Sequence, residues 1–156
     1  MTVLFLTKHF GEIEVDESKI ITFEEGIPGF THCTKYILLE DTQDDGKNSG
    51  LISWLQSLDE PVVAFVLMNV FIIMPDYDPV IHESDIESLG EYNEEDFLIY
   101  NIAVVPDDIS KVSVNLKAPV VIHAVTRKGR QVVAANDDYG IRVQIFEEIK
   151  KSKGVV

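Results

Sequence analysis

The sequence predicts an all-β, single-domain fold: an antiparallel β-barrel-like or sandwich arrangement with a short helical insert. Three observations support this fold class. Short apolar runs with the two-residue period of strands dominate the chain, turn-forming residues separate them, and one internal segment carries helix signals. A chain of 156 residues, 46% hydrophobic and 26% charged, is long enough for one domain with a substantial core. We expect a β domain over residues 1–142 and a C-terminal tail or short helix over residues 143–156.

Strands are expected throughout the first half of the chain. They cover Val3–His9, Gly11–Val15, Ile20–Phe23, Tyr36–Leu39, Ile52–Ser57 and Val63–Met74. The last of these is expected to break near Asn69. Thr31–Thr34 is predicted to form a single helical turn, and Asp41–Gly50 a loop, because Asp, Asn, Ser and Gly are concentrated there. From the alternation along their strands, Trp54 and Phe65 are expected in the core.

One internal segment, His82–Gly90, has the signals of a short helix. Ser84 can cap its first turn, and Glu87 can complete a capping box. Gly90 is placed where it would end the helix. Asn93 is predicted to cap a second short turn directly afterwards.

More strands are expected after the insert. They cover Leu98–Val105, Lys111–Lys117, Val120–Val125 and Gln131–Ala135. Between the last two, Arg127–Arg130 is predicted to form the tip of a hairpin in which Gly129 supplies a positive φ angle. In that register Val125 would face Val132.

Acidic residues are unevenly distributed along the chain. The formal net charge is −14, from 13 basic and 27 acidic residues, yet no Lys or Arg occurs between Asn48 and Ser110. That span holds 13 acids: Asp59, Glu60, Asp76, Asp78, Glu83, Asp85, Glu87, Glu91, Glu94, Glu95, Asp96, Asp107 and Asp108. Two interpretations remain open, solubility alone or an acidic face for a basic partner. Direct nucleic-acid binding is disfavoured, because phosphate contacts need a basic surface.

Features that would direct the chain to a membrane or an oxidising compartment are not evident. The longest mostly apolar stretch, Val62–Met74, is too short to span a bilayer. The apolar run at the N-terminus meets Lys8 early and lacks a signal-peptide pattern. A single cysteine, Cys33, excludes an internal disulfide framework. We therefore expect a cytoplasmic location and no membrane partner.

The histidines do not form a metal-binding motif. None of His9, His32, His82 and His123 is paired at H-x-H or H-x3-H spacing. His32 and Cys33 are neighbours, and neighbours on a strand point to opposite faces, so we expect them to chelate poorly. Neither a metal nor a cofactor is expected.

Catalytic motifs are missing as well. The sequence contains no G-x-S-x-G, P-loop or G-x-G-x-x-G pattern. Gly26–Gly29 is not a phosphate-binding loop, because Pro28 lacks an amide donor and no helix signal follows. We interpret it as a rigid turn that orients Phe30. Asp76 and Asp78 would share a face if extended, so a hydrolase or a small-ligand-binding barrel remains the alternative to a protein without enzymatic activity.

Five segments, in this order and spacing, carry a family resemblance. They are Gly26–Phe30; Trp54–Ser57 with Asp59-Glu60-Pro61 and Ala64-Phe65; Pro75–Tyr77; Val114–Leu116 with Ala118-Pro119; and Arg127–Val132. From about Gly11 to Arg142 the chain resembles the family of the bacterial flagellar assembly factor FliW. The resemblance implies a small barrel-like, non-enzymatic, cytoplasmic regulator. It also implies two partners, flagellin and the translational regulator CsrA, which the protein antagonises so that flagellin level is coupled to flagellin translation.

The resemblance and the charge pattern together suggest two sets of partner-binding residues. An apolar groove for the C-terminal helical segment of flagellin is expected to include some of Ile27, Pro28, Phe30 and Phe71, which lie in or beside turns. CsrA binds RNA and therefore carries basic surface, so its expected site is the acidic stretch with Asp76, Tyr77, Asp78 and Glu83. The sequence leaves open whether Phe30 and Phe71 are contacts or core residues.

Overall fold

The computed structural model describes residues 1–40, 50–91 and 93–152, and short strands make up most of its regular structure. The strands are β1 (Thr2–Thr7), β2 (Gly11–Asp16), β3 (Ile21–Thr22), β4 (Lys35–Glu40), β5 (Ile52–Ser57), β6 (Ala64–Met68), β7 (Phe97–Val104), β8 (Ser113–Val114), β9 (Val120–His123), β10 (Lys128–Gln131) and β11 (Val143–Gln144). The helices are α1 (Glu83–Ile86) and α2 (Phe146–Ser152). Short 3₁₀ turns are η1 (Glu17–Lys19), η2 (Val70–Ile72), η3 (Glu87–Leu89), η4 (Glu94–Asp96) and η5 (Ile109–Lys111).

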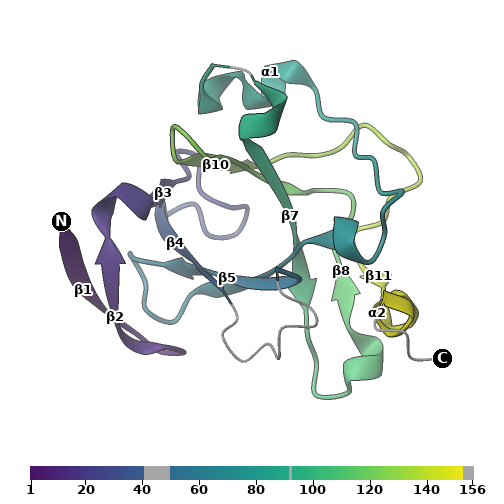
Figure 1. Cartoon of the computed structure of the whole chain (residues 1–156), viewed down its shortest axis with the longest axis horizontal. Coiled ribbons are helices and arrows are strands. Elements are labelled where there is room, and N and C mark those ends of the chain that lie inside the picture. Colours follow the sequence, from purple (N-terminus) through teal and green to yellow (C-terminus); the bar gives the residue numbers. More distant parts are fainter. Residues whose placement is uncertain (41–49, 92, 153–156) are drawn as a thin grey trace.

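Seven of these strands close into a β-barrel (Figure 1). Around the barrel they follow the order β7, β6, β5, β4, β3, β10 and β9, and β9 pairs with β7 to complete the ring. Neighbouring strands are antiparallel, apart from β3 and β10, which pair in parallel through Thr22 and Lys128. The predicted all-β, barrel-like class with a short helical insert is confirmed.

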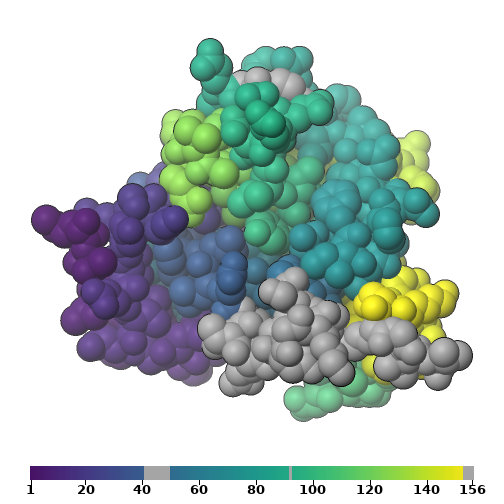
Figure 2. All heavy atoms as spheres, in the orientation of Figure 1, coloured from purple at the N-terminus to yellow at the C-terminus, as the bar shows by residue number. Residues whose placement is uncertain are grey.

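Two additions flank the barrel. Strands β8 and β11 extend the sheet beyond β7, and β1 and β2 form a separate hairpin. Figure 2 shows that hairpin, in purple, on the opposite side of the molecule from α2, in yellow. The segment expected as a tail or short helix therefore contains both β11 and α2. Between them, Ile145 is completely buried.

Within the described part of the chain, buried apolar side chains form three clusters. The barrel core contains Ile21, Phe23, Ile27, Cys33, Tyr36, Leu55, Val63, Leu67, Val120 and Ile122. A second core, beside β8, β11 and α2, contains Leu51, Met68, Val70, Ile73, Tyr77, Ala103, Val112, Val114, Leu116 and Ile145. A third core, beneath α1 and η3, contains Ile86, Leu89, Val121 and Val132. Burial of each large apolar side chain stabilises the fold by roughly 1.5–3 kcal/mol relative to leaving it exposed.

The hairpin between β9 and β10 differs from the sequence prediction. Its strands pair His123 with Lys128 and Ile122 with Gly129, so the tip lies before Lys128. Arg127, with φ +59°, supplies the left-handed residue. Gly129 is a strand residue, and a Cβ there would lie 2.6 Å from Cζ of Phe23. The prediction of a positive φ at Gly129 was wrong, because this glycine makes room for an aromatic ring.

The helical insert is present, but the predicted caps are not. His82, not Ser84, precedes the first turn of α1, and no side chain caps it. Asn93 precedes η4 without a side-chain bond to its backbone, whereas Gly90 ends η3 as predicted. These turns are held by contacts with the barrel instead.

Most predicted strands are confirmed, with bounds that differ by a few residues. The strand predicted at Gln131–Ala135 was wrong: β10 lies at Lys128–Gln131, because the hairpin tip lies earlier than predicted. Three other segments need comment. The apolar run after Val63 does break at Asn69, where η2 follows β6. Thr31–Thr34 is not helical: one turn, closed by the Cys33 N–H donating to Phe30 O at 3.0 Å, leads into β4. The predicted loop lies at 41–50, and its residues 41–49 fall outside the described part of the chain.

Candidate partner-binding surfaces

Four of the five segments that carry the family resemblance contribute residues to one groove of about 370 Å³. We call it the signature groove. It is lined by Ile27, Pro28, Phe65, Ile102, Asn115, Ala118, Gln131 and Val133. Its apolar floor continues into the barrel core, where Ile27 is buried and both Phe65 and Ile102 pack. The groove is therefore a mainly apolar surface with two amide side chains.

One wall of the signature groove is a tight turn made by Gly26–Phe30. The Phe30 N–H donates to Ile27 O at 2.7 Å, with Pro28 and Gly29 (φ +89°) between them, which is the pattern of a type II turn. Gly26 has φ +68°, and a Cβ there would lie 2.5 Å from Cα of Thr31. The turn buries Ile27 and leaves Pro28 exposed at the groove. The ring of Phe30 packs edge-on against Phe65, with centroids 5.1 Å apart.

The two amide side chains of the groove hold the segment before Pro119. Oδ1 of Asn115 accepts from Ala118 N at 2.9 Å, and Nε2 of Gln131 donates to Ala118 O at 3.0 Å. The sequence left open whether Asn115 satisfies a backbone group or faces a partner. It does satisfy a backbone group, and it also lines the groove.

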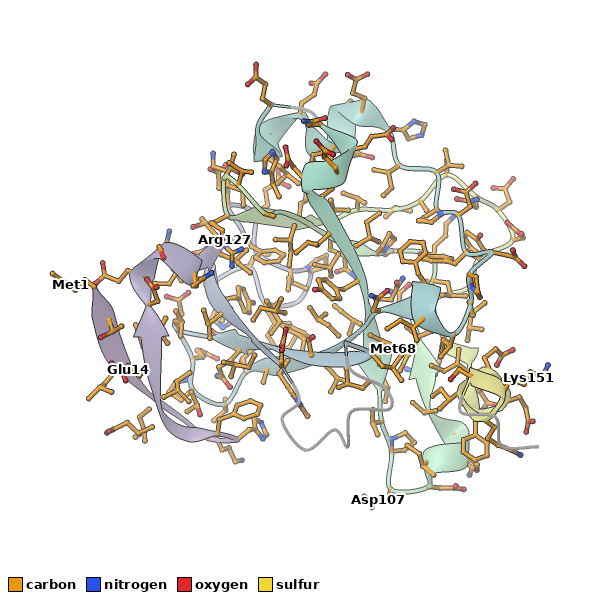
Figure 3. The ribbon with its side chains drawn as sticks, in the orientation of Figure 1. Met1, Glu14, Met68, Asp107, Arg127 and Lys151 are labelled. Atoms are coloured by element: carbon orange, nitrogen blue, oxygen red, sulfur yellow. The ribbon has the colours of Figure 1, made fainter. Side chains whose placement is uncertain are left out.

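A second groove, of about 440 Å³, lies beside the helical insert. We call it the acidic groove. It is lined by Asp78, Pro79, Val80, Ile81, Ile86, Glu94, Phe97, Ile99 and Val121. Its floor consists of side chains in or against the third core, and Asp78 and Glu94 are its acidic lining residues. Carboxylates also project outward from the helical insert (Figure 3). An apolar floor with an acidic rim suits a partner with both apolar and cationic groups.

The rim of the acidic groove is fixed by residues from the chain after β10. Oδ1 of Asn136 accepts from Val80 N at 2.7 Å, and its Nδ2 donates to Asp78 O at 3.1 Å. The hydroxyl of Tyr139 accepts from Asp78 N at 2.9 Å. The Ala135 N–H also donates to Val80 O at 2.8 Å, so four hydrogen bonds hold the extended segment that carries Asp78.

The structure separates the predicted contact residues into exposed and buried groups. Pro28, Phe71, Asp76, Asp78 and Glu83 are exposed, and Phe30 is partly buried. Ile27 and Tyr77 are only 2% and 4% exposed. Their side chains are therefore core, contrary to the expectation that residues in turns would face a partner.

Tyr77 has a structural role between the two grooves. Its hydroxyl donates to Leu116 O at 2.7 Å and accepts from Nδ2 of Asn101 at 3.0 Å. Burial raises the pKa of Tyr77 to about 12, although the hydrogen bond from Asn101 acts in the opposite direction. Phe71 packs near Tyr77, with ring centroids 5.5 Å apart, and lines neither groove. The expected apolar set of Ile27, Pro28, Phe30 and Phe71 is thus not one surface.

Several lining residues were missed by sequence reasoning. In the signature groove these are Ile102, Ala118, Gln131 and Val133. Ala118 and Gln131 belong to segments that carry the resemblance, so the order of those segments was a usable signal. Val133 is 62% exposed although it is apolar. It follows the end of β10, in a segment that was predicted as strand and is not one.

Within the described residues, one cluster has ligands suited to a metal ion. His32, Cys33 and Glu60 place one potential ligand atom each within 4.8 Å of one another. The argument that His32 and Cys33 point to opposite faces of a strand does not apply, because both precede β4 and lie in or beside a turn. No helix among the described residues has both the length and the apolar character needed to cross a membrane.

A closed seven-strand barrel with shallow surface grooves defines a small β-barrel protein, and the comparisons with known proteins identify its family. The FliW protein family model matches residues 5–145. "Flagellar assembly factor FliW" of Lachnoclostridium phytofermentans is 40% identical over 148 residues, covering 95% of this chain and 94% of that protein. The protein of the same name from Lachnospira eligens is 41% identical over 148 residues, covering 94% and 97%. A crystal structure of the flagellar assembly factor FliW superposes with a TM-score of 0.82 at 33% identity, covering 92% of this chain and 97% of that one. The chain belongs to the FliW family.

Proposed function

We propose that this protein is a flagellar assembly factor that acts in the cytoplasm by binding two proteins, flagellin and CsrA. Binding CsrA would relieve its repression of flagellin translation, and accumulating flagellin would take the factor away again. The observation that carries the proposal is family membership over nearly the whole chain, with relatives named as flagellar assembly factors. No reaction is part of this function.

The acidic groove is the proposed site for CsrA. Asp78 lines it. Asp76 and Glu83 are exposed and lie close in sequence to lining residues, in a stretch of chain that has no Lys or Arg from Asn48 to Ser110. A concentrated anionic surface raises the encounter rate with a basic protein and repels RNA. The apolar floor beneath the insert would then supply affinity that salt does not screen.

The signature groove is the proposed site for flagellin. Pro28, Phe65, Ile102 and Val133 give it an apolar surface of the kind that accepts one face of an amphipathic helix. The remaining amide atoms of the groove, Nδ2 of Asn115 and Oε1 of Gln131, can form hydrogen bonds that fix the position of such a helix. This assignment replaces the earlier set, because Ile27 is buried and Phe71 lies elsewhere.

Strand β7 connects the two grooves, and this supports mutually exclusive binding. Ile99 lines the acidic groove, and Ile102 on the same strand lines the signature groove. Exclusion requires either overlapping footprints or a coupling free energy that disfavours the ternary complex. A shared, hydrogen-bonded strand is a short path for such coupling.

Size-exclusion chromatography of the three purified proteins tests the proposal. We expect a complex with CsrA alone, a complex with flagellin alone, and displacement of CsrA when flagellin is added. A stable ternary peak at micromolar concentration contradicts exclusive binding. Failure to bind either partner contradicts the proposed function itself.

The hydrolase alternative has no supporting geometry at the residues that suggested it. Asp76 lies in a turn rather than a strand, and the intervening Tyr77 is buried in the second core. Asp76 and Asp78 are both exposed. A carboxylate pair needs partial burial to separate the pKa values of its acid and base.

A further inference from the structure

We propose that His32, Cys33 and Glu60 form a binding site for a single zinc ion. The site is distinct from both grooves and does not depend on the proposed function. It joins the turn before β4 to the turn between β5 and β6, two segments 28 residues apart in sequence. From the sequence we expected His32 and Cys33 to chelate poorly, because neighbours on a strand point to opposite faces, but the structure has no strand at these two residues.

The donor set fits zinc in type and in spacing. Zinc prefers thiolate, imidazole and carboxylate ligands, at about 2.3 Å for sulfur and about 2.0–2.2 Å for nitrogen and oxygen. Two such ligands at tetrahedral angles lie about 3–4 Å apart. Nε2 of His32 and Oε1 of Glu60 are 3.1 Å apart, and all three ligand atoms fall within 4.8 Å. Closing the site around an ion needs only small side-chain movements.

Two of the three ligand side chains are exposed and one is buried, so an ion can enter from solvent. The side chains of His32 and Glu60 are 55% and 45% exposed, whereas Cys33 is completely buried beneath them. The two exposed ligands can rotate to admit the ion from solvent, and the thiolate meets it from the protein side. Three protein ligands leave a fourth position for water, as in open zinc sites.

The backbone that carries the three ligands is already fixed by hydrogen bonds. Oδ2 of Asp59 accepts from Thr34 N at 2.8 Å and from Lys35 N at 2.9 Å, which ties the two turns together. Oγ of Ser57 accepts from Asp59 N at 3.1 Å and from Glu60 N at 3.0 Å. The ligands therefore come from preorganised positions, which lowers the entropic cost of binding.

A simple ion pair explains less of the arrangement. An exposed pair of the His32–Glu60 type stabilises a protein by about 0–1 kcal/mol and needs no thiol beneath it. A zinc ion uses all three groups: the Cys33 thiol releases its proton to solvent as its sulfur binds, and the cation compensates the resulting negative charge. Because Cys33 follows Phe30 by one turn, an occupied site would also stabilise the turn that forms one wall of the signature groove.

Metal titration of the purified full chain tests the proposal. We expect one equivalent of zinc to bind, and cobalt to give the thiolate charge-transfer absorption of a Co–S bond. His32→Ala and Glu60→Gln should each weaken zinc binding by about tenfold to hundredfold or more. That is the loss typical of removing a group that only supports a ligand, and these residues are ligands themselves. His82→Ala, which removes another exposed histidine, is the matched control and should bind as the wild type does.

Two further measurements guard against misfolding and adventitious binding. Zinc should raise the melting temperature of the wild type and leave that of His32→Ala unchanged, because only the folded wild type holds the complete site. Cys33→Ser should abolish the cobalt absorption, and its folding can be checked by circular dichroism; if it does not fold, the exposed variants decide. Wild-type zinc affinity in both His32→Ala and Glu60→Gln, or no stoichiometric binding by the wild type, would overturn the site.

Discussion

The signature groove and the acidic groove are held in shape in different ways. The first is walled by barrel strands and by the Gly26–Phe30 turn, whose backbone is fixed by its own hydrogen bond and by close packing. The second lies beside an insert whose helix, α1, has four residues and no side-chain cap. A helix of that length is not stable alone.

The insert depends on tethers from the β9–β10 hairpin. Nη1 of Arg130 donates to Asp85 O at 2.8 Å, and Oγ1 of Thr126 donates to Leu89 O at 2.5 Å. Nε2 of His123 lies 3.0 Å from Glu91 O. The signature groove therefore presents a fixed apolar shape, whereas the acidic groove presents charge on a tethered element. Shape selects a partner mainly through affinity, and charge acts mainly on the rate of encounter.

The largest expected effect concerns the fixed wall of the signature groove. In Gly26→Ala the added Cβ would meet the backbone of Thr31 at 2.5 Å, in a conformation that also disfavours side chains. Since backbone must move, we expect a loss of about 3 kcal/mol or more in the free energy of unfolding. Urea denaturation measures it.

Gly29→Ala is the control for that change. Gly29 also has positive φ, but a Cβ there has nothing within 4 Å. Only the conformational penalty of about 1–2 kcal/mol should remain. Equal losses in the two variants would mean that the turn is not held by close packing against Thr31.

The next effect tests the apolar shape of the same groove. Val133 is 62% exposed, so Val133→Glu should fold normally while placing a charge on the groove surface. We expect flagellin binding to weaken by about tenfold or more, because a charge must lose water to meet an apolar helix. Calorimetry with the flagellin C-terminal segment measures the change.

Val125→Glu is the matched control for the groove. Val125 is 69% exposed and does not line the signature groove. It should bind flagellin as the wild type does. If both variants lose affinity equally, net charge rather than the groove determines binding.

Strands and the barrel class were predictable because their signals are local. Alternation of apolar and polar residues decides which face of a strand is buried, and neighbouring residues alone reveal it. The break at Asn69 was likewise readable from an apolar run too long for one strand. The reason for a glycine at position 129 could not be predicted from nearby residues. A side chain there would collide with the ring of Phe23, which lies more than 100 residues earlier.

Site residues were harder to predict because exposure in a turn is decided by distant partners. Tyr77 is drawn into the second core by Leu116, 39 positions along the chain. The His32–Cys33–Glu60 cluster depends on how the turn before β4 meets another hairpin, through Asp59. Sequence order identified which segments form the signature groove, but the side chain that each contributes required the register.

A smaller effect tests charge at the acidic groove. Asp76→Asn, Asp78→Asn and Glu83→Gln together remove three exposed charges. We expect CsrA to associate several-fold more slowly at low salt, with a flatter salt dependence and little change in melting temperature. Stopped-flow measurements at two salt concentrations report this.

Three acids elsewhere give the control with the same change in net charge. Glu12, Glu17 and Asp107 are exposed on β2, on η1 and after β7, outside the acidic groove. Replacing them by Gln, Gln and Asn should change the association rate less. An association rate that the groove variant leaves unaltered would place the CsrA interface elsewhere.

A further effect, on stability, concerns Tyr77, which connects the acidic rim to the signature groove. Tyr77→Phe removes the hydrogen bonds to Leu116 O and from Asn101, so we expect a loss of about 1–2 kcal/mol near neutral pH. Tyr36→Phe is the contrast, because the buried Tyr36 hydroxyl has no hydrogen-bond partner among the described residues. It should cost little or nothing near neutral pH.

At alkaline pH both tyrosines should lower the stability of the folded protein. Burial raises the pKa of Tyr77 to about 12 and raises that of Tyr36 as well, from the usual value of 10.0. Below pH 10 each phenol keeps its proton in both the folded and the unfolded state, so ionisation of these tyrosines does not reduce stability. As pH rises from 10 towards 12, the unfolded chain loses the proton first, so stability falls. Each Phe variant should therefore lose stability less steeply than the wild type over that range in urea titrations at successive pH values. A slope unchanged in Tyr77→Phe would mean that the ring is not buried in solution, and that the link between the two grooves is open to water.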